Sequence, residues 1–303
     1  MRSEAIASVR RFNRTVTQRI GALSNEYLAR ARPLGASRVL WEVGEDGVVD
    51  VRQLRERLGV DSGHLSRLLR RLECEGLIVV EPSPADRRVR SARLTDRGRA
   101  ERDVLDHRSD TLAASLLKPL DDRDRARLVD AMSVVERLLT AGLVEIVVEP
   151  PTSAAARFCL ESYFAELNTR FEAGFEPARS ISATAKELVE PRGLLLVGRL
   201  RGEPIACGAL KLHNSDPVEI KRMWVSPTAR GLGLGRRLLA ELERYARIHG
   251  ATVARLETNR SLTEAINLYR SAGYVEARAF NDEPYADHWF EKVLMGRTTA
   301  TAA

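Results

Sequence analysis

A glycine-rich turn in the carboxyl-terminal half has the residue types and the spacing to hold a pyrophosphate. The turn reads Arg-Gly-Leu-Gly-Leu-Gly-Arg over residues 230–236 and follows a strand-like segment that ends at Val225. Glycine lets the backbone adopt conformations that other residues avoid and lets a ligand approach closely. A helix that begins at this turn would offer unpaired N–H groups to an anion. The sequence therefore predicts a site for a phosphate-bearing ligand.

The spacing separates this turn from the common nucleotide-binding motifs. It reads Arg-x-x-Gly-x-Gly, whereas dinucleotide-binding folds carry Gly-x-Gly-x-x-Gly, and no Gly-Lys-Ser/Thr follows it. No acidic ribose ligand is evident about 20 residues further on at a strand end, because the nearby Arg255 and Glu257 fit a strand better. A turn that only caps an ordinary helix is the other interpretation. The strand, Pro227, the turn and the following helix together resemble the coenzyme A motif of the GNAT acyltransferases.

This resemblance covers nearly all of the carboxyl-terminal half and implies an N-acetyltransferase that uses acetyl-CoA as its co-substrate. In such enzymes a backbone N–H at the strand end, here that of Val225, polarises the thioester carbonyl. Asn259 would contact the pantetheine arm, because the family's usual asparagine position is Leu262 in this chain. The implied cofactor-binding residues are Val225, Arg230, Gly231, Leu232, Gly233, Leu234, Gly235, Arg236 and Asn259.

The resemblance also implies two catalytic residues. An acceptor ammonium must lose a proton before it attacks a thioester, and GNAT enzymes often carry a glutamate at the strand position of Glu219. The motif Leu-Tyr-x-x-x-Gly-Tyr at 268–274 matches the family, where its tyrosine, here Tyr269, can protonate the leaving thiolate. Each residue has another interpretation. Glu219 can be a strand-edge charge beside Lys221, and Tyr269 can belong to an apolar helix stripe.

An aromatic and polar tail, residues 280–292, stands where GNAT substrate pockets close. Its Asn281, Tyr285 and His288 are candidate contacts for the acceptor amine, with ordinary loop packing as the alternative. No cysteine or serine stands in a nucleophile motif, so the amine would attack directly, without a covalent enzyme intermediate.

The amino-terminal half has the pattern of a nucleic-acid-binding helix. Leucines at 65, 68, 69 and 72 form one apolar stripe, Asp61 or Ser62 is a natural N-cap, and Gly76 stands where a helix ends. A shorter amphipathic helix over 51–58 precedes it, so the pair describes a helix-turn-helix. The predicted DNA-facing residues of the second helix are Ser62, His64, Ser66, Arg67 and Arg70.

A β-hairpin with a basic tip follows this helix. Strands are expected over 77–80 and 89–94, and the turn between them carries Arg87 and Arg88, which suit the negative potential of a minor groove. The run from Asp86 to Gly98 resembles the MarR family signature. In that family the wing arginine, here Arg88, contacts the minor groove of double-stranded DNA, and Asp86 orients it.

The MarR resemblance covers roughly residues 10–140 and implies a homodimer that forms through the first and last helices, near 5–30 and 97–140. Such a dimer would place its two recognition helices about one turn of DNA apart. A basic cluster at 87–102 is consistent with a phosphate-backbone partner, although a solvated charged face has the same composition.

The composition of the chain indicates its number of domains and its class of protein. A chain of 303 residues with 44% apolar residues and net charge +6 predicts about two globular domains. No run of about 18 apolar residues or signal peptide is evident. Cys74, Cys159 and Cys207 lack metal or disulfide spacing. We therefore expect a cytoplasmic protein without metal or membrane association.

The predicted architecture is multidomain, with a mostly α winged helix-turn-helix domain over 1–145 and an α/β GNAT domain over 146–303. The expected strands of the second domain are 143–149, 193–200, 205–213, 218–225, 251–257, 274–280 and 288–294, and the expected helices are 153–171, 233–249 and 261–272. The predicted function combines transcriptional regulation with acetylation of a small-molecule or protein amine. Two alternatives are a regulator whose GNAT half only senses acyl-CoA, and an acetyltransferase whose winged half only dimerises.

Overall fold

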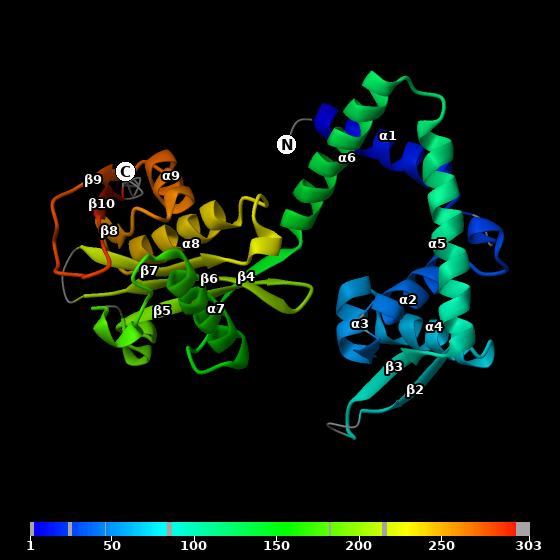
Figure 1. Ribbon diagram of the computed structural model, residues 1–303, viewed down its shortest axis with the longest axis horizontal. Coiled ribbons are helices and arrows are strands. Elements are labelled where there is room, and N and C mark those ends of the chain that lie inside the picture. Colours follow the sequence, from blue (N-terminus) through cyan, green and yellow to red (C-terminus); the bar gives the residue numbers. More distant parts are fainter. Residues whose placement is uncertain are drawn as a thin grey trace, which may run out of the picture. The chain divides into compact units, whose positions relative to one another are not determined.

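The computed structural model describes residues 3–23, 26–45, 47–83, 87–181, 183–213 and 217–294. The chain gathers into two compact units, Met1–Met132 and Ser133–Ala303 (Figure 1). The predicted class is confirmed, because a mostly helical unit with a small antiparallel sheet precedes an α/β unit. Within the described ranges, no helix is long and apolar enough to cross a bilayer.

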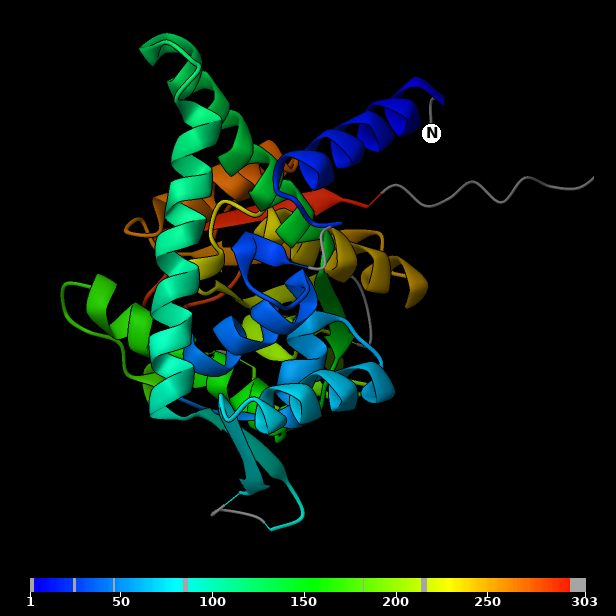
Figure 2. The ribbon, with the colours of Figure 1, turned by 90° about the vertical axis from the view of Figure 1, so that its right-hand side faces the viewer.

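The first unit is built around a helix-turn-helix and a hairpin (Figure 2). Its helices are α1 (Ser3–Arg19), α2 (Leu34–Glu45), α3 (Val51–Leu58), α4 (Ser62–Cys74) and α5 (Asp96–Leu117), and α6 (Asp122–Gly142) follows across the unit boundary. The strands β1 (Val48–Asp50), β2 (Ile78–Pro82) and β3 (Arg90–Leu94) form an antiparallel sheet in the order β1-β3-β2.

Local signals begin and end α4 as the sequence predicts. The Asp61 carboxylate accepts a hydrogen bond from the His64 backbone N–H at 2.8 Å. Gly76 follows the helix with φ +68°, a conformation in which side chains are strained. Leu65, Leu69 and Leu72 are buried and Leu68 packs beside them, so the apolar stripe holds this helix on the core.

Two features of the first unit differ from the sequence prediction. The first helix ends at Arg19 rather than near residue 30, and Gly21, with φ +68°, follows it. A short 3-10 turn, Tyr27–Ala29, comes next, and the Arg108 guanidinium donates to the carbonyls of Leu28 and Ala29 at 2.6 and 2.9 Å. The third strand, β1, was not predicted, because three residues are too short to show a period.

The second unit is a seven-stranded sheet covered by helices. Its strands are β4 (Val144–Val148), β5 (Gly193–Leu200), β6 (Glu203–Lys211), β7 (Val218–Val225), β8 (Val253–Thr258), β9 (Val275–Glu276) and β10 (His288–Val293), in the order β4-β5-β6-β7-β8-β10-β9. The helices are α7 (Ala154–Arg170), α8 (Leu234–Ile248) and α9 (Thr263–Ser271), with 3-10 turns at Pro177–Arg179, Ala185–Leu188 and Pro227–Ala229. The strand predicted over 274–280 is only β9, because Ala277 makes the last backbone bond to Trp289.

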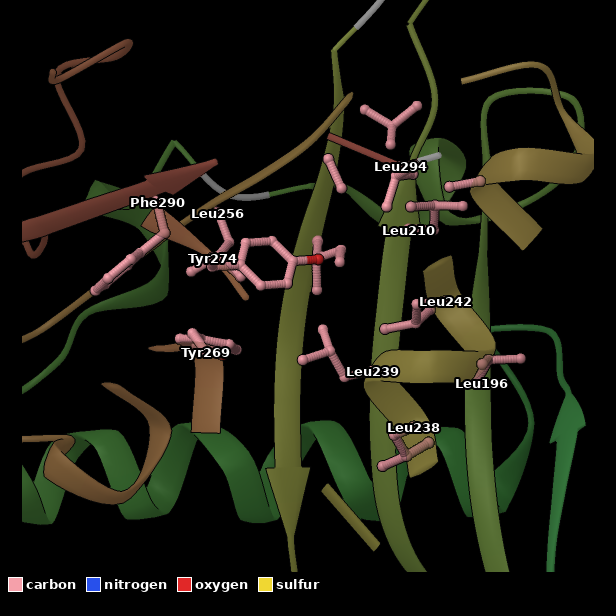
Figure 3. Packing of buried hydrophobic residues seen from close by; sticks show 14 of the residues in the cluster. Leu196, Leu210, Leu238, Leu239, Leu242, Leu256, Tyr269, Tyr274, Phe290 and Leu294 are labelled. Carbon is pink, nitrogen blue, oxygen red and sulfur yellow. The ribbon is translucent and has the colours of Figure 1, made fainter. Parts of the chain in front are cut away.

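Both faces of the sheet are buried, and the alternation of β5 shows how. Leu194 and Leu196 belong to the core under α8 and α9, which Figure 3 shows from close by. Leu195 and Val197 point to the other face, into a second cluster with α7. A strand covered on both sides has no polar face to display, which is why its sequence is a continuous apolar run.

Candidate functional site

The centre of the second unit is a place where two strands separate. Strands β7 and β8 run parallel but pair only at Val218 with Ala254 and at Glu219 with Arg255. Both strands continue, to Val225 and Thr258. The facing backbone groups beyond residue 219 therefore have no ladder partner on that side. Residues of β7 line two cavities, and residues of β8 line one of them.

The first cavity, the glycine-turn cleft, lies where β7 meets α8 and encloses about 1300 Å³, its open mouth included. Gly231 and Gly233 have φ +82° and +71°, and a Cβ added at either would meet nothing within 4 Å. Gly233 is the N-cap of α8, and no side chain caps this helix. The first N–H groups of α8 and the helix dipole are therefore available to an anion, without a side chain in the way.

The two arginines of the turn are tethered by neighbouring side chains. The Arg230 guanidinium donates to both carboxylate oxygens of Glu166 on α7, each at 2.6 Å. Arg236 donates to the Ser271 hydroxyl at 2.9 Å. Arg230 therefore connects the turn to α7 and shapes the cleft. The backbone at Gly231 and Gly233 faces open space.

The second cavity, the aromatic cavity, encloses about 670 Å³ with its mouth and is lined mainly by α7, β7, β8 and the segment before β10. Phe171, Phe175 and Tyr285 form its wall, with ring centroids 4.8 to 5.8 Å apart. The charged side chains of its lining are Lys221, Arg222, Glu257 and Glu283. Apolar walls with a few polar groups are typical of small-molecule sites.

Tyr269 lines both cavities, together with Met223 and a few apolar neighbours. It is only 5% exposed, and burial raises its pKa well above the ordinary value. The phenol therefore keeps its proton at neutral pH. A neutral phenol at the junction of two cavities can donate that proton to a group that leaves with negative charge.

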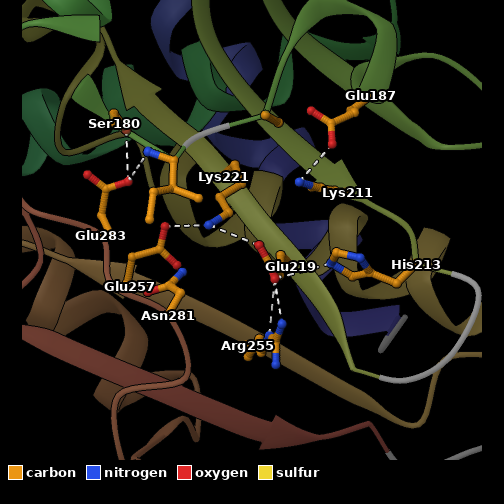
Figure 4. Close-up of polar contacts among 12 residues, drawn as sticks. Ser180, Glu187, Lys211, His213, Glu219, Lys221, Arg255, Glu257, Asn281 and Glu283 are labelled. Carbon is orange, nitrogen blue, oxygen red and sulfur yellow. Dashed lines mark hydrogen bonds and ion pairs between the residues drawn. The ribbon is translucent and has the colours of Figure 1, made fainter. Parts of the chain in front are cut away.

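A buried network of charges connects β7 with β8 (Figure 4). Lys221 Nζ contacts Glu257 Oε1 and lies 3.0 Å from Glu219 Oε2. The Arg255 guanidinium donates to Glu219 Oε1 at 2.6 Å, and His213 Nε2 lies 3.1 Å from the same oxygen. Burial alone would raise the pKa of Glu219, but the charges and hydrogen bonds of Lys221 and Arg255 outweigh it and hold that pKa at about 2.

Glu257 differs from Glu219 in what surrounds its carboxylate. Lys221 occupies only Oε1, while Oε2 is buried and has no hydrogen-bond partner among the described residues. Glu257 lines the aromatic cavity, whereas Glu219 lines neither cavity. An unpartnered buried acceptor is costly, so a proton-bearing ligand group would stabilise it.

The first unit carries a polar face on α4. Arg87 and Arg88 are exposed in the connection between β2 and β3, and Asp86 lies outside the described residues. The α4 residues predicted to face DNA are all exposed: Ser62, His64, Ser66, Arg67 and Arg70.

Comparisons with known proteins match a different family in each of the two units. The profile of the acetyltransferase (GNAT) family matches residues 160–274, and that of the MarR family matches residues 35–89. The chain is 31% identical to the N-alpha-acetyltransferase RimI of Mycobacterium tuberculosis over 139 residues, which cover 45% of this chain and 82% of that protein. The chain belongs to the GNAT acetyltransferase family. Its first unit carries a MarR-family domain.

Two further relatives match one half each. The IAA acetyltransferase of Azospirillum brasilense is 39% identical over 99 residues, covering 32% of this chain and 63% of that protein. The HTH-type transcriptional regulator TtmR of Methylorubrum extorquens is 36% identical over 120 residues, covering 39% of this chain and 57% of that protein. The chain thus spans less than two thirds of the length of these two relatives.

The GNAT half brings most of the predicted cofactor residues together. All of them line the glycine-turn cleft except Leu232 and Asn259. Asn259 lies in the aromatic cavity instead, where its Nδ2 donates to the Tyr285 carbonyl at 2.8 Å. Asn259 therefore holds the loop that carries Tyr285, and it does not lie in the cleft, where a contact with pantetheine was predicted.

Of the predicted catalytic residues and acceptor contacts, Tyr269 and Tyr285 lie at the aromatic cavity. Asn281 accepts a hydrogen bond from Trp289 and His288 contacts Glu276, and neither is part of the lining. Glu219 is held by cations on both carboxylate oxygens, which leaves it a weak base. The geometry therefore gives no support to its predicted role as proton acceptor.

Sequence reasoning missed Glu257 and Arg222. One signal for Glu257 is its place near the end of a strand next to the glycine-turn strand, twelve residues before Tyr269. For Arg222 the signal is a pair of adjacent charges, with Lys221, in the middle of a strand that is otherwise buried. Neither signal shows which side chain faces a ligand. Among the residues that the structure describes, no cluster of His, Cys, Asp or Glu could hold a metal ion.

Proposed function

We propose that residues 1–145 bind double-stranded DNA as a regulator, and that residues 146–303 transfer acetyl from acetyl-CoA to an amine. The observation that carries the second part is the meeting of two cavities at Tyr269, one formed by the glycine turn and one by the aromatic wall. Acetyl-CoA fits the first cavity because positive-φ glycines and an uncapped helix start suit a pyrophosphate.

The residues at the junction suggest how the transfer would proceed. Glu257 Oε2 would take a proton from the acceptor ammonium, so that the free amine can attack the acetyl carbonyl carbon. The Val225 N–H, at the end of β7, would polarise the carbonyl oxygen. As the C–S bond breaks, Tyr269 would give its proton to the departing sulfur, and the second proton of the attacking nitrogen would pass to the phenolate through solvent. Direct attack is supported because, among the described residues, no cysteine lines either cavity. The Ser180 hydroxyl donates its hydrogen bond to Glu283.

Thiol release separates this proposal from its first alternative, an acyl-CoA sensor. The full chain is incubated with acetyl-CoA and a panel of amines, and free coenzyme A is measured. We expect release that depends on an amine. Acetyl-CoA binding by calorimetry without release for any amine would favour the sensor.

DNA binding separates the proposal from its second alternative, a winged half that only dimerises. Arg88→Ala should weaken binding to the preferred DNA about tenfold and lower the slope against log salt by about 1, because one phosphate or groove cation is lost. The control is Arg157→Ala, an exposed arginine of α7. Equal affinity of the Arg88→Ala and control proteins at fixed salt would contradict the assigned contact.

A further inference from the structure

We propose that the amine acceptor is a free amino acid with an apolar side chain, whose carboxylate is bound by Arg222. This inference rests on the proposed transferase function and names the substrate class of the same site. It begins with the backbone, because Arg222 lies inside β7 with φ +58°, in the left-handed region that few non-glycine residues adopt. Such an outlier at a cavity wall points to a function for the side chain that it directs.

A β-bulge produces this conformation. Cys207 pairs with Trp224 and Ala209 pairs with Lys221, so two residues of β7 oppose Gly208 alone. A Cβ at Gly208 would lie 2.8 Å from the Met223 sulfur, which explains why glycine stands there. The Cys207 thiol donates to the Arg222 carbonyl at 3.3 Å and holds the bulge in place. Bulges re-aim side chains, and here the re-aimed side chain is that of Arg222.

The guanidinium of Arg222 forms no ion pair among the described residues, although the Glu283 carboxylate of the same cavity lies near enough to act on it electrostatically. It lies over the Phe164 ring, 4.4 Å from the centroid, and donates to the Ala183 carbonyl at 3.2 Å. Its Nε is buried with no hydrogen-bond partner, and no described carboxylate forms an ion pair with it. A half-buried guanidinium with a buried, unpartnered nitrogen is costly unless a ligand group pairs with it.

The other charges of the aromatic cavity are already engaged. Lys221 is matched by the carboxylates of Glu219 and Glu257. Glu283 accepts from the Ser180 hydroxyl at 2.9 Å and from the Ile181 N–H at 2.7 Å. Arg222 is therefore the cation of this lining that a ligand can pair with. A carboxylate is the complementary group, since a guanidinium binds it through two parallel hydrogen bonds.

The remaining walls define the rest of the acceptor. Glu257 would face the amine, and the rings of Phe171, Phe175 and Tyr285 offer an apolar surface to a side chain. An amine, a carboxylate and an apolar group on one small molecule describe an apolar amino acid. A peptide N-terminus presents an amide in place of that carboxylate and would leave Arg222 unpaired.

Binding and turnover of matched ligands test the inference. L-phenylalanine and L-phenylalaninamide are titrated into the full chain with coenzyme A by calorimetry, and both are assayed as acceptors with acetyl-CoA. The acid should bind about 10- to 100-fold more tightly than the amide, the range expected for a charge-assisted pair. Arg222→Met should bind the acid no better than the amide, whereas the exposed control Arg157→Met should keep the preference.

The outcomes distinguish this inference from the proposed function. If wild type binds acid and amide equally, or prefers the amide or a dipeptide, the carboxylate contact is wrong, and thiol release with other amines would still support the transferase. If the acid is preferred without thiol release, the transferase proposal fails and the binding inference holds. Should Arg222→Met fail to fold, the wild-type comparison and Arg222→Lys, which keeps the charge but loses the bidentate geometry, still decide.

Discussion

The glycine-turn cleft and the aromatic cavity meet at Tyr269, but they are built in different ways. The cleft is lined by one contiguous stretch, from the end of β7 through the first turn of α8, whose glycines leave the backbone open, and by side chains of α7 and α9. The cavity takes its surface from side chains of α7, β7, β8 and the segment before β10. Backbone contacts suit a group shared by many reactions, and side chains suit a group that varies. We therefore expect that substitutions in one cavity can impair binding of the cofactor or of the acceptor without affecting the other.

The largest expected effect is on the acceptor side, from Glu257→Gln. Losing a general base lowers kcat by about 10²–10⁴-fold, and the defect should be greatest at low pH, where the amine is protonated. At high pH free amine is already present, so the defect should shrink. Acetyl-CoA affinity should not change, because Glu257 does not line the cleft.

The measurement is a pair of pH–rate profiles, with acetyl-CoA affinity by calorimetry. The matched control is Glu241→Gln, a half-buried glutamate of α8 that is paired with Arg244 and lines neither cavity. A Glu257→Gln profile parallel to that of wild type would remove Glu257 from proton transfer.

An intermediate effect is expected on the cofactor side, from Gly233→Ala. Gly233 and Gly250 stand at opposite ends of α8 with φ +71° and +81°, and both would place a Cβ in open space. The two alanine variants should therefore lose similar thermal stability. Only Gly233→Ala should weaken acetyl-CoA binding, by about 10- to 100-fold, which corresponds to roughly 1.4–2.8 kcal/mol.

Calorimetry with acetyl-CoA and thermal unfolding of both variants give the comparison. If Gly250→Ala loses as much affinity as Gly233→Ala, the loss reflects helix strain and the glycine turn is not the pyrophosphate site.

The smallest effect is expected from Glu219→Gln, which acts through Lys221. Its pKa near 2 keeps Glu219 ionised over the whole working range, so the substitution should leave the shape of the pH–rate profile unchanged. The rate should fall about tenfold, equivalent to roughly 1.4 kcal/mol, because Lys221 would lose one of the two carboxylates that position it beside Glu257. A change in the shape of the profile would return Glu219 to the role of base.

The same substitution has a stability signature. The folded pKa of about 2 lies below the ordinary value of 4.5, so the stability from Glu219 is present above that value and is lost as the pH falls toward 2. Glu219→Gln should therefore lower the free energy of unfolding at pH 7 and flatten its decline in acid. Denaturant unfolding at neutral and acidic pH measures both. If the free energy of unfolding of the variant fell with pH as steeply as that of wild type, a group other than Glu219 would be responsible for the acid sensitivity.

The sequence predicted features that depend on neighbouring residues. The bounds of α3, β5 and β7 agree with the expectation, because caps, glycines and continuous apolar runs are local signals. The glycine turn was predictable for the same reason. Arg222 and Glu257 lie 35 positions apart, and they share a cavity only because β7 and β8 diverge, which pairing in space determines. The short strand β9 was overpredicted, since its neighbours turn away into the 280–286 segment.

The left-handed backbone of Arg222 also has a consequence for evolution and engineering. A non-glycine residue in this conformation costs roughly 1–2 kcal/mol, so selection for a stable fold alone would favour glycine at this position. A library screened only for thermal resistance should therefore enrich Arg222→Gly while acceptor discrimination disappears. At position 222, fold stability and the proposed binding of the acceptor favour different residues. A stabilised variant that keeps its acceptor preference would have to retain arginine there, at the cost of some stability.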